Sequence, residues 1–353
     1  MRPHTITYPP DGIEPIGVIE FVHGMCETRN RYAAPMEYFS RHGYICAIAD
    51  MRGHGENILT TDDLGYFGEE GYKGLVNDVQ EYTMYLKREF PNLPFILLGH
   101  SMGSLVVRTY LKKYSQEVDA VILSGSPSEN SLAAAGKFLA KFLAFFRGWH
   151  YRSPFIENMV NGPFEKPFLK EGIVNSWLST DKFIVEEYNK DPLCGVPFTL
   201  NGYYCLFSLM EQVYSKLGWN NKNKQLPVMF MSGGDDPCRK SDKDFKKAVT
   251  HFKHCGFPNT FSKLYPGMRH ELFNELNNEE VYYDILKFLE IKVGIDGNDY
   301  EIIRTVQNAK LYSLPNSGGP GTYGFTISGV AILATALLLF IKNKRREEEA
   351  KRS

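Results

Sequence analysis

The sequence has few cysteines, no excess of charge of either sign and no hydrophobic run near its start. Its 6 cysteines in 353 residues form no C-x-x-C pair, so we expect free thiols and neither a zinc site nor a disulfide framework. The 40 basic and 41 acidic side chains give a net charge of −1, which lacks the basic excess of nucleic-acid-binding proteins. Met1 to Pro10 contains neither the basic nor the apolar region of a signal peptide.

A sharp turn around Ser101 is the most informative local pattern. Ser101 lies in a G-x-S-x-G motif between an apolar run and an apolar-periodic helix. Gly99 and Gly103 permit the tight strand-to-helix turn of a nucleophile elbow, because a Cβ at either position would crowd the neighbouring elements. Ser101 is therefore a candidate nucleophile, and the N–H of Met102, at the N-terminus of the helix, can stabilise an anion.

Strand-like and helix-like segments alternate on both sides of Ser101. This alternation predicts an α/β fold with a mostly parallel sheet covered by helices on both faces. The expected strands cover residues 17–23, 44–50, 95–98, 119–124, 227–232 and 260–265. The expected helices cover residues 31–41, 71–90, 105–114 and 278–291.

The alternation stops at residues 125–226, a helical and aromatic stretch that prolines divide into short pieces. We expect this stretch to be a helical cap inserted into the sheet domain. Its most apolar helix covers residues 131–149. The apolar face of this helix either lines an acyl-chain pocket or only packs the cap against the sheet, since every amphipathic helix has to bury such a face.

Two loops after the last expected strands supply a candidate acid and a candidate base. Asp236 follows the strand over 227–232, with Asp235 as the alternative acid, and His270 follows the strand over 260–265. The chain order Ser, Asp, His is that of an α/β-hydrolase.

A further loop follows the first expected strand and ends in His23-Gly24. Glycine there lets the backbone come close to the site, and the N–H of Met25 can point at a developing oxyanion. We expect the remaining loop histidines His23, His54 and His100 to be structural.

Five motifs, taken in order, resemble the lysophospholipase and monoacylglycerol lipase branch of the α/β-hydrolase superfamily, a branch often labelled serine aminopeptidase S33-like. They are V-H-G-M-C-E at 22–27, D-M-R-G-H-G at 50–55, G-H-S-M-G at 99–103, G-G-D-D at 233–236 and G-M-R-H-E at 267–271. The resemblance implies an α/β-hydrolase domain over residues 1–292. It also implies a catalytic triad, an oxyanion hole made of two backbone N–H groups, and no metal or organic cofactor. The implied residues are Ser101 as nucleophile, His270 as general base, Asp236 as its orienting acid, and Met25 and Met102 for the oxyanion hole.

The chain beyond residue 292 has a different composition. Residues 293–322 are expected to be a linker that contains Leu-Pro-Asn-Ser-Gly at 314–318, and residues 342–353 form a charged tail that begins with a basic cluster. Between them, residues 323–341 form an uncharged apolar run close to the length that crosses a bilayer, so a single C-terminal transmembrane helix is expected.

This tail resembles a Gram-positive cell-wall sorting signal, although Ser317 stands where threonine is usual. The resemblance implies a sortase as a processing partner. Basic residues after a membrane span favour a cytoplasmic tail and an exterior hydrolase. The free cysteines and the start of the sequence favour the opposite side, so the sequence leaves the sidedness open.

Together these features predict a membrane-tethered serine hydrolase that cleaves carboxylic esters of lipids, either lysophospholipids or monoacylglycerols, through an acyl-enzyme. The alternative within enzymes is an aminopeptidase or amidase, which would need a carboxylate in the cap to bind a substrate amine. The cap offers Glu157, Glu165, Glu171, Asp181, Glu186 and Glu187. The alternative outside enzymes is a non-catalytic binding protein displayed at the surface.

Overall fold

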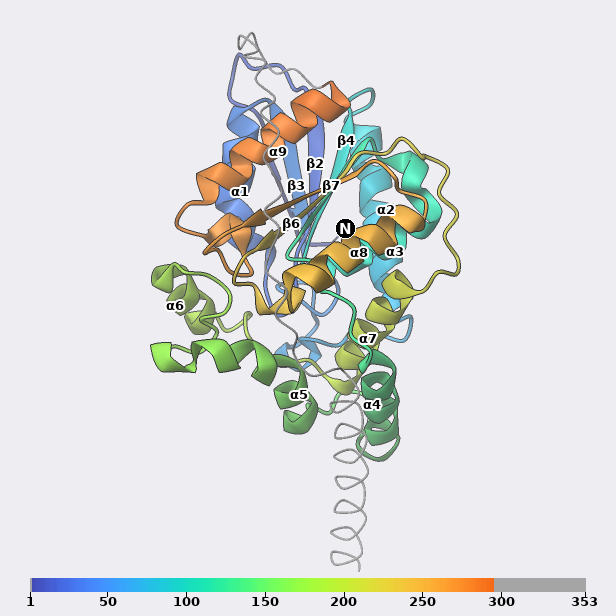
Figure 1. The fold of residues 1–353 in the computed structure, drawn as a ribbon, viewed down its shortest axis with the longest axis vertical. Helices are drawn as coiled ribbons and strands as arrows, with labels where there is room; N and C mark the ends of the chain where they lie inside the picture. Colours follow the sequence, from blue (N-terminus) through green and yellow to red (C-terminus); the bar gives the residue numbers. More distant parts are fainter. Residues whose placement is uncertain (1, 295–353) are drawn as a thin grey trace, which may run out of the picture. The chain divides into compact units, whose positions relative to one another are not determined.

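The computed structural model describes residues 2–294, and Figure 1 shows their arrangement. Seven strands form one sheet in the order β1-β3-β2-β4-β5-β6-β7. Six of them run parallel, and only the edge strand β1 runs antiparallel to its neighbour β3. The strands are β1 (His4–Thr7), β2 (Gly17–Val22), β3 (Tyr44–Ala49), β4 (Phe95–His100), β5 (Ala120–Ser124), β6 (Val228–Gly233) and β7 (Thr260–Tyr265).

The sequence predicted the six parallel strands and missed β1. Apart from β7, the parallel strands are buried almost throughout, and their apolar runs mark them in the sequence. The four residues of β1 are partly exposed and alternate between polar and apolar too briefly to be distinctive.

The register of the sheet brings the carboxyl ends of its central strands to one edge. Val22 of β2 pairs with Gly99 of β4, and His100 of β4 pairs with Ser124 of β5. Loops that follow these strands therefore meet at the same edge, which is where ligands bind in parallel sheets.

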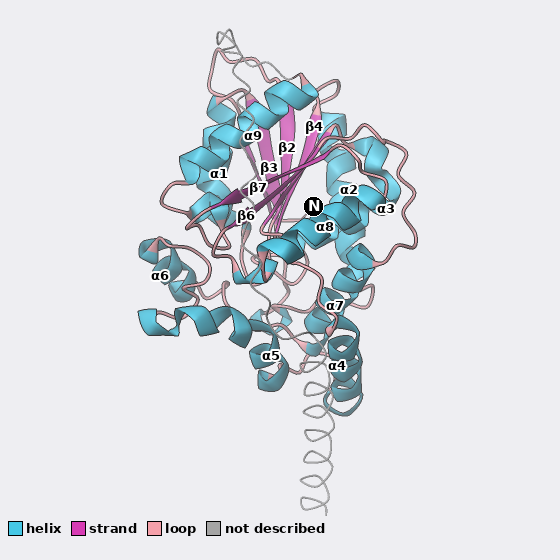
Figure 2. Ribbon diagram, viewed as in Figure 1, coloured by secondary structure: helices cyan, strands magenta, loops and turns pink. Residues whose placement is uncertain are grey.

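Helices cover both faces of the sheet, as predicted (Figure 2). On one face lie α1 (Ala33–Arg41) and α9 (Asn278–Val293). On the other face lie α2 (Tyr72–Glu89), α3 (Met102–Tyr114) and α8 (Asp242–His254). Side chains of each strand alternate between the two cores, so Val18 of β2 belongs to the core under α2 and α3, and Ile19 belongs to the core under α1 and α9.

Between β5 and β6 the chain forms four α-helices and one 3-10 helix (Lys166–Glu171) at the carboxyl edge of the sheet, and this is the segment that the sequence predicts as a cap (Figure 1). Ser153, Asp181 and Thr199 each accept a backbone hydrogen bond as the N-cap of α5, α6 and α7. The four α-helices are α4 (Ala133–Arg147), α5 (Pro154–Glu165), α6 (Lys182–Lys190) and α7 (Leu200–Tyr214).

The apolar helix expected at 131–149 is α4, and it contacts α7 extensively. Its buried positions are small residues, namely Ala133, Gly136, Ala140 and Ala144. A Cβ at Gly136 would come within 2.8 Å of the Phe207 ring on α7, which shows how closely the two helices approach.

The predicted linker, transmembrane segment and charged tail lie almost entirely outside the described residues. Over residues 2–294, no helix is both long enough and apolar enough to span a bilayer.

Candidate active site

Ser101 occupies a strained turn between β4 and α3. Its backbone has φ 50° and ψ −119°, a conformation that is unusual for a residue with a side chain. The Ser101 N–H donates to the carbonyl of Ser124 at the end of β5, at 2.9 Å. A Cβ on Gly99 would come within 2.8 Å of the backbone of α3, and one on Gly103 would collide with the Val22 carbonyl. Both glycines are therefore required by the close approach of backbone segments, as the sequence predicted.

The loop after β2 passes next to Ser101. A Cβ on Gly24 would lie 3.1 Å from the Cβ of Ser101, so a side chain there would crowd the serine. Met25 follows in the same loop and lines the same cavity as Ser101. Met102 is the first residue of α3, where backbone N–H groups lack partners within the helix. The structure thus places both candidate oxyanion residues beside the serine.

Asp236 and His270 meet across the loops that follow β6 and β7. The Nδ1 atom of His270 lies 3.0 Å from Oδ1 of Asp236, and both side chains are buried. Asp236 also accepts hydrogen bonds from the Cys238 N–H at 2.8 Å and from the Ser232 hydroxyl at 3.1 Å. Asp235 is exposed instead, so the geometry favours Asp236 over the alternative acid.

The electrostatic surroundings favour the charged form of His270. Burial is the largest single influence and lowers the pKa of this imidazole, but the charge and hydrogen-bond interactions with Asp236 and Cys238 together raise it by more, so the pKa lies well above its ordinary value of 6.5. The imidazole Nδ1 faces the carboxylate, which leaves Nε2 for a proton from the serine.

Asp236, Cys238 and His270 form a cluster whose ligand atoms lie within 4.8 Å of one another. These are residue types that bind transition metals, but a cysteine binds a metal only in its deprotonated form, as a thiolate. Burial raises the pKa of Cys238 to about 11, and the other two side chains are hydrogen-bonded to each other. The cluster therefore fits a hydrogen-bonded pair with a neutral thiol beside it better than a metal centre.

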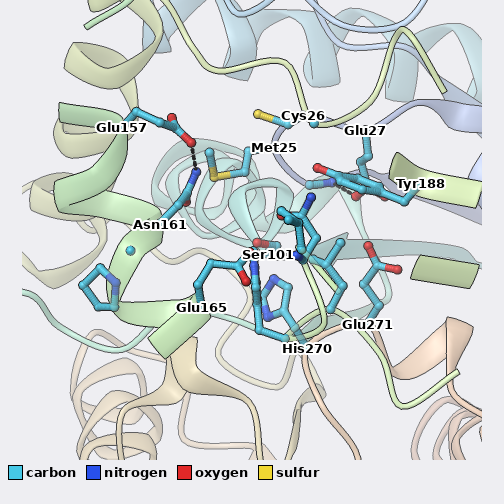
Figure 3. A pocket seen from close by; sticks show the side chains of 18 of the residues that line it. Met25, Cys26, Glu27, Ser101, Glu157, Asn161, Glu165, Tyr188, His270 and Glu271 are labelled. Atoms are coloured by element: carbon cyan, nitrogen blue, oxygen red, sulfur yellow. Dashed lines mark hydrogen bonds between the residues drawn. The ribbon is translucent and has the colours of Figure 1, made fainter. Parts of the chain in front are cut away.

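A cavity of about 850 Å³ opens above Ser101, and Figure 3 shows Ser101 and His270 side by side in its wall. Helix α5 contributes one polar face to this wall, through Glu157, Asn158, Asn161 and Glu165. No residue of α4 lines it. The interpretation of α4 as an acyl-pocket wall is therefore wrong for this cavity, because its small residues pack on α7 and α5 lies closer to the serine.

Only two of the six cap carboxylates considered from the sequence reach the cavity. Glu157 and Glu165 line it, and burial raises the pKa of each. Glu171 pairs with Arg269 on the protein surface, and Asp181 caps α6. The other two, Glu186 and Glu187, are exposed.

A charged network that the sequence analysis missed joins the oxyanion loop to the histidine loop. Arg31 pairs with Glu27 at 3.4 Å and also with Glu271, the neighbour of His270. Glu27 accepts hydrogen bonds from the Gly24 N–H and from the Tyr32 hydroxyl. Burial and the nearby Glu271 raise the pKa of Glu27 to about 7. Arg31 therefore holds together two loops that each carry part of the site.

The spacing of Glu27 and Arg31, four residues apart, and the position of Glu271 next to His270 were the available signals for this network. They were weak because the pairing with Glu271 joins positions far apart in the chain.

The three histidines expected to be structural differ in location. His23 accepts from the Met51 N–H at 2.9 Å, and His54 contacts the Arg52 carbonyl at 3.1 Å. Neither lines the cavity, whereas His100 does, with its ring centroid 4.8 Å from that of His270. His100 therefore contributes to the wall of the site, which the sequence did not indicate.

Comparisons with known proteins identify the family to which this chain is similar. Residues 13–277 match the model of the family described as serine aminopeptidase, S33, and residues 307–348 match the LPXTG cell wall anchor motif. The monoacylglycerol lipase of Mycolicibacterium smegmatis is 26% identical over 78% of this chain and 89% of its own length. The phospholipase YtpA of Bacillus subtilis is 25% identical over 76% of this chain and 93% of its own.

A solved structure with the same fold is a thermostable carboxyl esterase from Bacillus coagulans in complex with glycerol. It has a TM-score of 0.76 and 24% identity, and the match covers 82% of this chain and 94% of the esterase. This likeness shows that the two chains share the same fold.

Proposed function

This chain belongs to the serine aminopeptidase S33 family of α/β-hydrolases, and we propose that it hydrolyses carboxylic esters of lipids, namely monoacylglycerols or lysophospholipids. The observation that carries the proposal is the hydrogen bond between buried His270 and Asp236 at the cavity that contains Ser101. The relatives named as a monoacylglycerol lipase and a phospholipase support a lipid ester as substrate.

In the proposed reaction, the Ser101 oxygen attacks the ester carbonyl while its proton moves to Nε2 of His270. Asp236 fixes the imidazole tautomer and stabilises the imidazolium. The N–H groups of Met25 and Met102 stabilise the oxyanion of the tetrahedral intermediate. The intermediate collapses to an acyl-enzyme, and the alcohol leaves with the proton from His270. Water then attacks the acyl-enzyme with His270 again as base, releases the fatty acid and regenerates Ser101.

The cavity supports a substrate with both apolar and polar parts. Its volume lies within the range of ~300–1,000 Å³ that is usual for small-molecule sites. Leu169, Val174, Trp177 and Leu178 supply apolar surface, while the polar face of α5 supplies amides and carboxylates. This division suits an acyl chain joined to a hydroxylated or charged head group.

A second candidate function is cleavage of an aminopeptidase or amidase substrate. The observation that favours it is the presence of Glu157 and Glu165 in the cavity, since a carboxylate of the cap can bind a substrate ammonium group. Asn161 donates to Glu157 at 2.7 Å, and the Asn175 N–H donates to Glu165 at 2.8 Å, so both carboxylates are held in place.

The C-terminal match supports a location for the enzyme. We propose that residues 307–348 act as a cell-wall sorting signal, with residues 323–341 crossing the membrane and a sortase cleaving within residues 314–318. The hydrolase then lies outside the cell. Accessibility of the intact protein to added protease on whole cells measures this directly, and protection from the protease would contradict it.

The proposed function is tested with the full chain and its Ser101→Ala variant. Release of fatty acid from monoacylglycerol and lysophosphatidylcholine is measured alongside cleavage of proline p-nitroanilide. We expect ester turnover, and a loss of about 10⁶-fold in the variant. Amide turnover without ester turnover would support the second candidate. A folded wild-type protein that cleaves none of the three substrates, and that a fluorophosphonate does not label, would support a non-catalytic surface protein.

A further inference from the structure

Helix α8, which lies on one face of the sheet, presents a row of lysines to solvent (Figure 1). The side chains that this helix buries in the core are apolar, namely Phe245, Ala248, Val249 and Phe252. Its exposed side chains include four lysines, Lys243, Lys246, Lys247 and Lys253. Positions three, four and seven residues apart share one face of a helix. These lysines therefore form a row that is about 15 Å long at ~1.5 Å per residue.

Most of the positive charge of this row is not neutralised. Among the lysines of the row, only Lys247 forms an ion pair within the described part of the chain, with Asp244 at 3.7 Å. The other acidic residue of α8, Asp242, pairs with Arg239. Both aspartates lie in the first turn of α8, where the helix dipole favours negative charge. The row beyond that turn therefore remains available to an anionic partner.

The loop between α7 and β6 adds three exposed lysines next to this row. The Trp219 ring of the loop packs on Phe252 of α8, with 5.6 Å between the ring centroids. The Asn221 amide donates to the Gly256 carbonyl, just after the end of α8. The loop therefore lies along the C-terminal end of the helix. Its exposed lysines are Lys216, Lys222 and Lys224. We call these three lysines and the four of α8 the basic surface.

The positive charge is concentrated in this part of a chain that is otherwise balanced. The whole sequence has 40 basic and 41 acidic side chains, whereas residues 215–254 carry nine lysines and arginines, four aspartates and no glutamate. Asp236, one of the four aspartates, is buried beside His270. A local basic excess on one face of a nearly neutral protein indicates a polyanionic partner.

The composition of the basic surface favours one kind of polyanion over others. Among the large apolar side chains that are exposed in the described residues, only Leu217 belongs to these two segments. A segment that binds a bilayer needs several such side chains. Proteins that bind bases use arginines or exposed aromatic rings. Arg239 is instead paired with Asp242, and Trp219 packs on α8. Lysines alone suit separate phosphate groups, since each ammonium group is a compact point charge.

We propose that the basic surface binds a polyol-phosphate chain of the cell wall, in which phosphodiesters join uncharged polyol units. The choice of a wall polymer rests on the proposed cell-wall location, while its negative charge and its phosphates are argued from the lysines. Ammonium groups replace the counterions of the phosphates, and release of those ions drives binding. A flexible chain can contact α8 and the loop together, whereas duplex DNA is stiff over about 50 nm. A second copy of this chain would bring lysines against lysines.

The basic surface is separate from the cavity above Ser101, because none of its seven lysines lines that cavity. Polymer binding therefore holds the hydrolase against the wall without contact between the polymer and the catalytic residues. Ester hydrolysis should be the same with and without bound polymer, so the two properties can be measured independently.

The proposal is tested with the full chain held in phosphatidylcholine nanodiscs. Binding of fluorescently labelled poly(glycerol phosphate) is measured by anisotropy between about 50 mM and about 200 mM salt. Unlabelled poly(glycerol phosphate), duplex DNA and phosphatidylglycerol vesicles serve as competitors. The variant combines Lys243→Gln, Lys246→Gln and Lys253→Gln. The matched control removes the same charge from exposed positions on α2, α6 and α9, and it combines Lys73→Gln, Lys182→Gln and Lys287→Gln.

We expect the α8 variant to bind the polymer at least about 10-fold more weakly than the wild type at the lowest salt concentration. The slope of log affinity against log salt concentration should also become shallower by about 2, because three phosphate contacts are lost. The control should bind like the wild type. Thermal melts and unchanged ester hydrolysis should show that both variants are folded.

Absence of wild-type binding, or binding that does not depend on salt, would overturn the proposal. Equal losses in the α8 variant and the control would also overturn it, because net charge would then explain the binding. Displacement of the polymer by duplex DNA or by phosphatidylglycerol vesicles at a lower phosphate concentration than by free polymer would assign the surface to that ligand instead. Binding is measured without substrate, so failure of the proposed ester hydrolysis would leave these results unaffected.

Discussion

The carboxyl edge of the sheet and the cap face the same cavity, yet they hold their polar side chains in different ways. At the sheet edge, Asp236 and His270 are buried. Three neighbours hold the Asp236 carboxylate in place, namely the Ser232 hydroxyl, the Cys238 N–H and the His270 ring. In the cap, Glu157 and Glu165 are only partly buried, and both lie on one helix. The sheet edge therefore holds chemical groups with little freedom, while the cap offers groups whose replacement should leave the fold intact. This difference predicts large losses of rate at the edge and selective, smaller changes at the cap.

The largest effect is expected from Asp236→Asn. The amide no longer stabilises the imidazolium of His270 and allows the wrong tautomer, so kcat for ester hydrolysis should fall by about 10⁴-fold. The carboxylate raises the pKa of His270, and the imidazole must be neutral to act as base. The wild type should therefore lose activity as the pH falls through a value above 6.5, and the variant should keep its residual activity to lower pH. Measurements of kcat/KM against pH check both expectations.

Asp235→Asn is the matched control for this variant, since it makes the same change at the neighbouring exposed position. It should retain wild-type rates and the wild-type pH profile. An equal loss in both variants would show that the acid has been assigned to the wrong residue, and an unchanged pH profile in Asp236→Asn would contradict the coupling to His270.

The network at Arg31 connects the two catalytic loops, and Arg31→Met should have the next largest effect. Removal of the guanidinium leaves the buried carboxylates of Glu27 and Glu271 without their shared cation, at a cost of about 3–5 kcal/mol in the free energy of unfolding. The pKa of Glu27 is already raised to about 7, and the loss of Arg31 raises it further. A carboxyl group whose pKa is higher in the folded than in the unfolded state destabilises the fold as the pH rises above its pKa in the unfolded state. The stability lost in Arg31→Met should therefore be smaller near pH 5 than near pH 8.

Thermal melts of the two proteins across this pH range measure the effect. Arg31→Lys keeps the charge and loses the planar guanidinium, so it should recover part of the stability. A difference in melting temperature that stays constant with pH would contradict the role assigned to Glu27.

The contrast between sheet and cap also explains which features could be predicted from the sequence. Ser101, Asp236 and His270 each follow a strand of the parallel sheet, and such a sheet brings the ends of its strands to one edge. Local sequence patterns were therefore sufficient to predict that these three residues lie near one another. The orientation of α4 was not predictable in this way. Its small residues and its phenylalanines both form apolar stripes, and only the partner helix α7 decides which stripe is buried.

The same reasoning applies to Arg31 and Glu271. Their contact depends on how the loop after β2 and the loop after β7 approach each other, and no periodic pattern in the sequence predicts that approach. Edge strand β1 was missed for a simpler reason, because four partly exposed residues carry almost no pattern.

The smallest and most selective effect is expected in the cap, from Glu157→Gln combined with Glu165→Gln. A carboxylate that binds a substrate ammonium group contributes about 1.5–3 kcal/mol, so KM for proline p-nitroanilide, or for an ester with a cationic head group, should rise by about 10-fold or more. Hydrolysis of an uncharged monoacylglycerol should change little, because glutamine keeps the size and much of the hydrogen bonding of glutamate.

Glu186→Gln, on an exposed part of the same cap, is the matched control and should leave the hydrolysis of both substrates unaffected. The ratio of kcat/KM for cationic and uncharged substrates is the quantity to measure, because a general disturbance of the cap lowers both values together. An unchanged ratio would show that the two carboxylates do not select the head group, and selection would then have to be sought in the apolar part of the cavity wall.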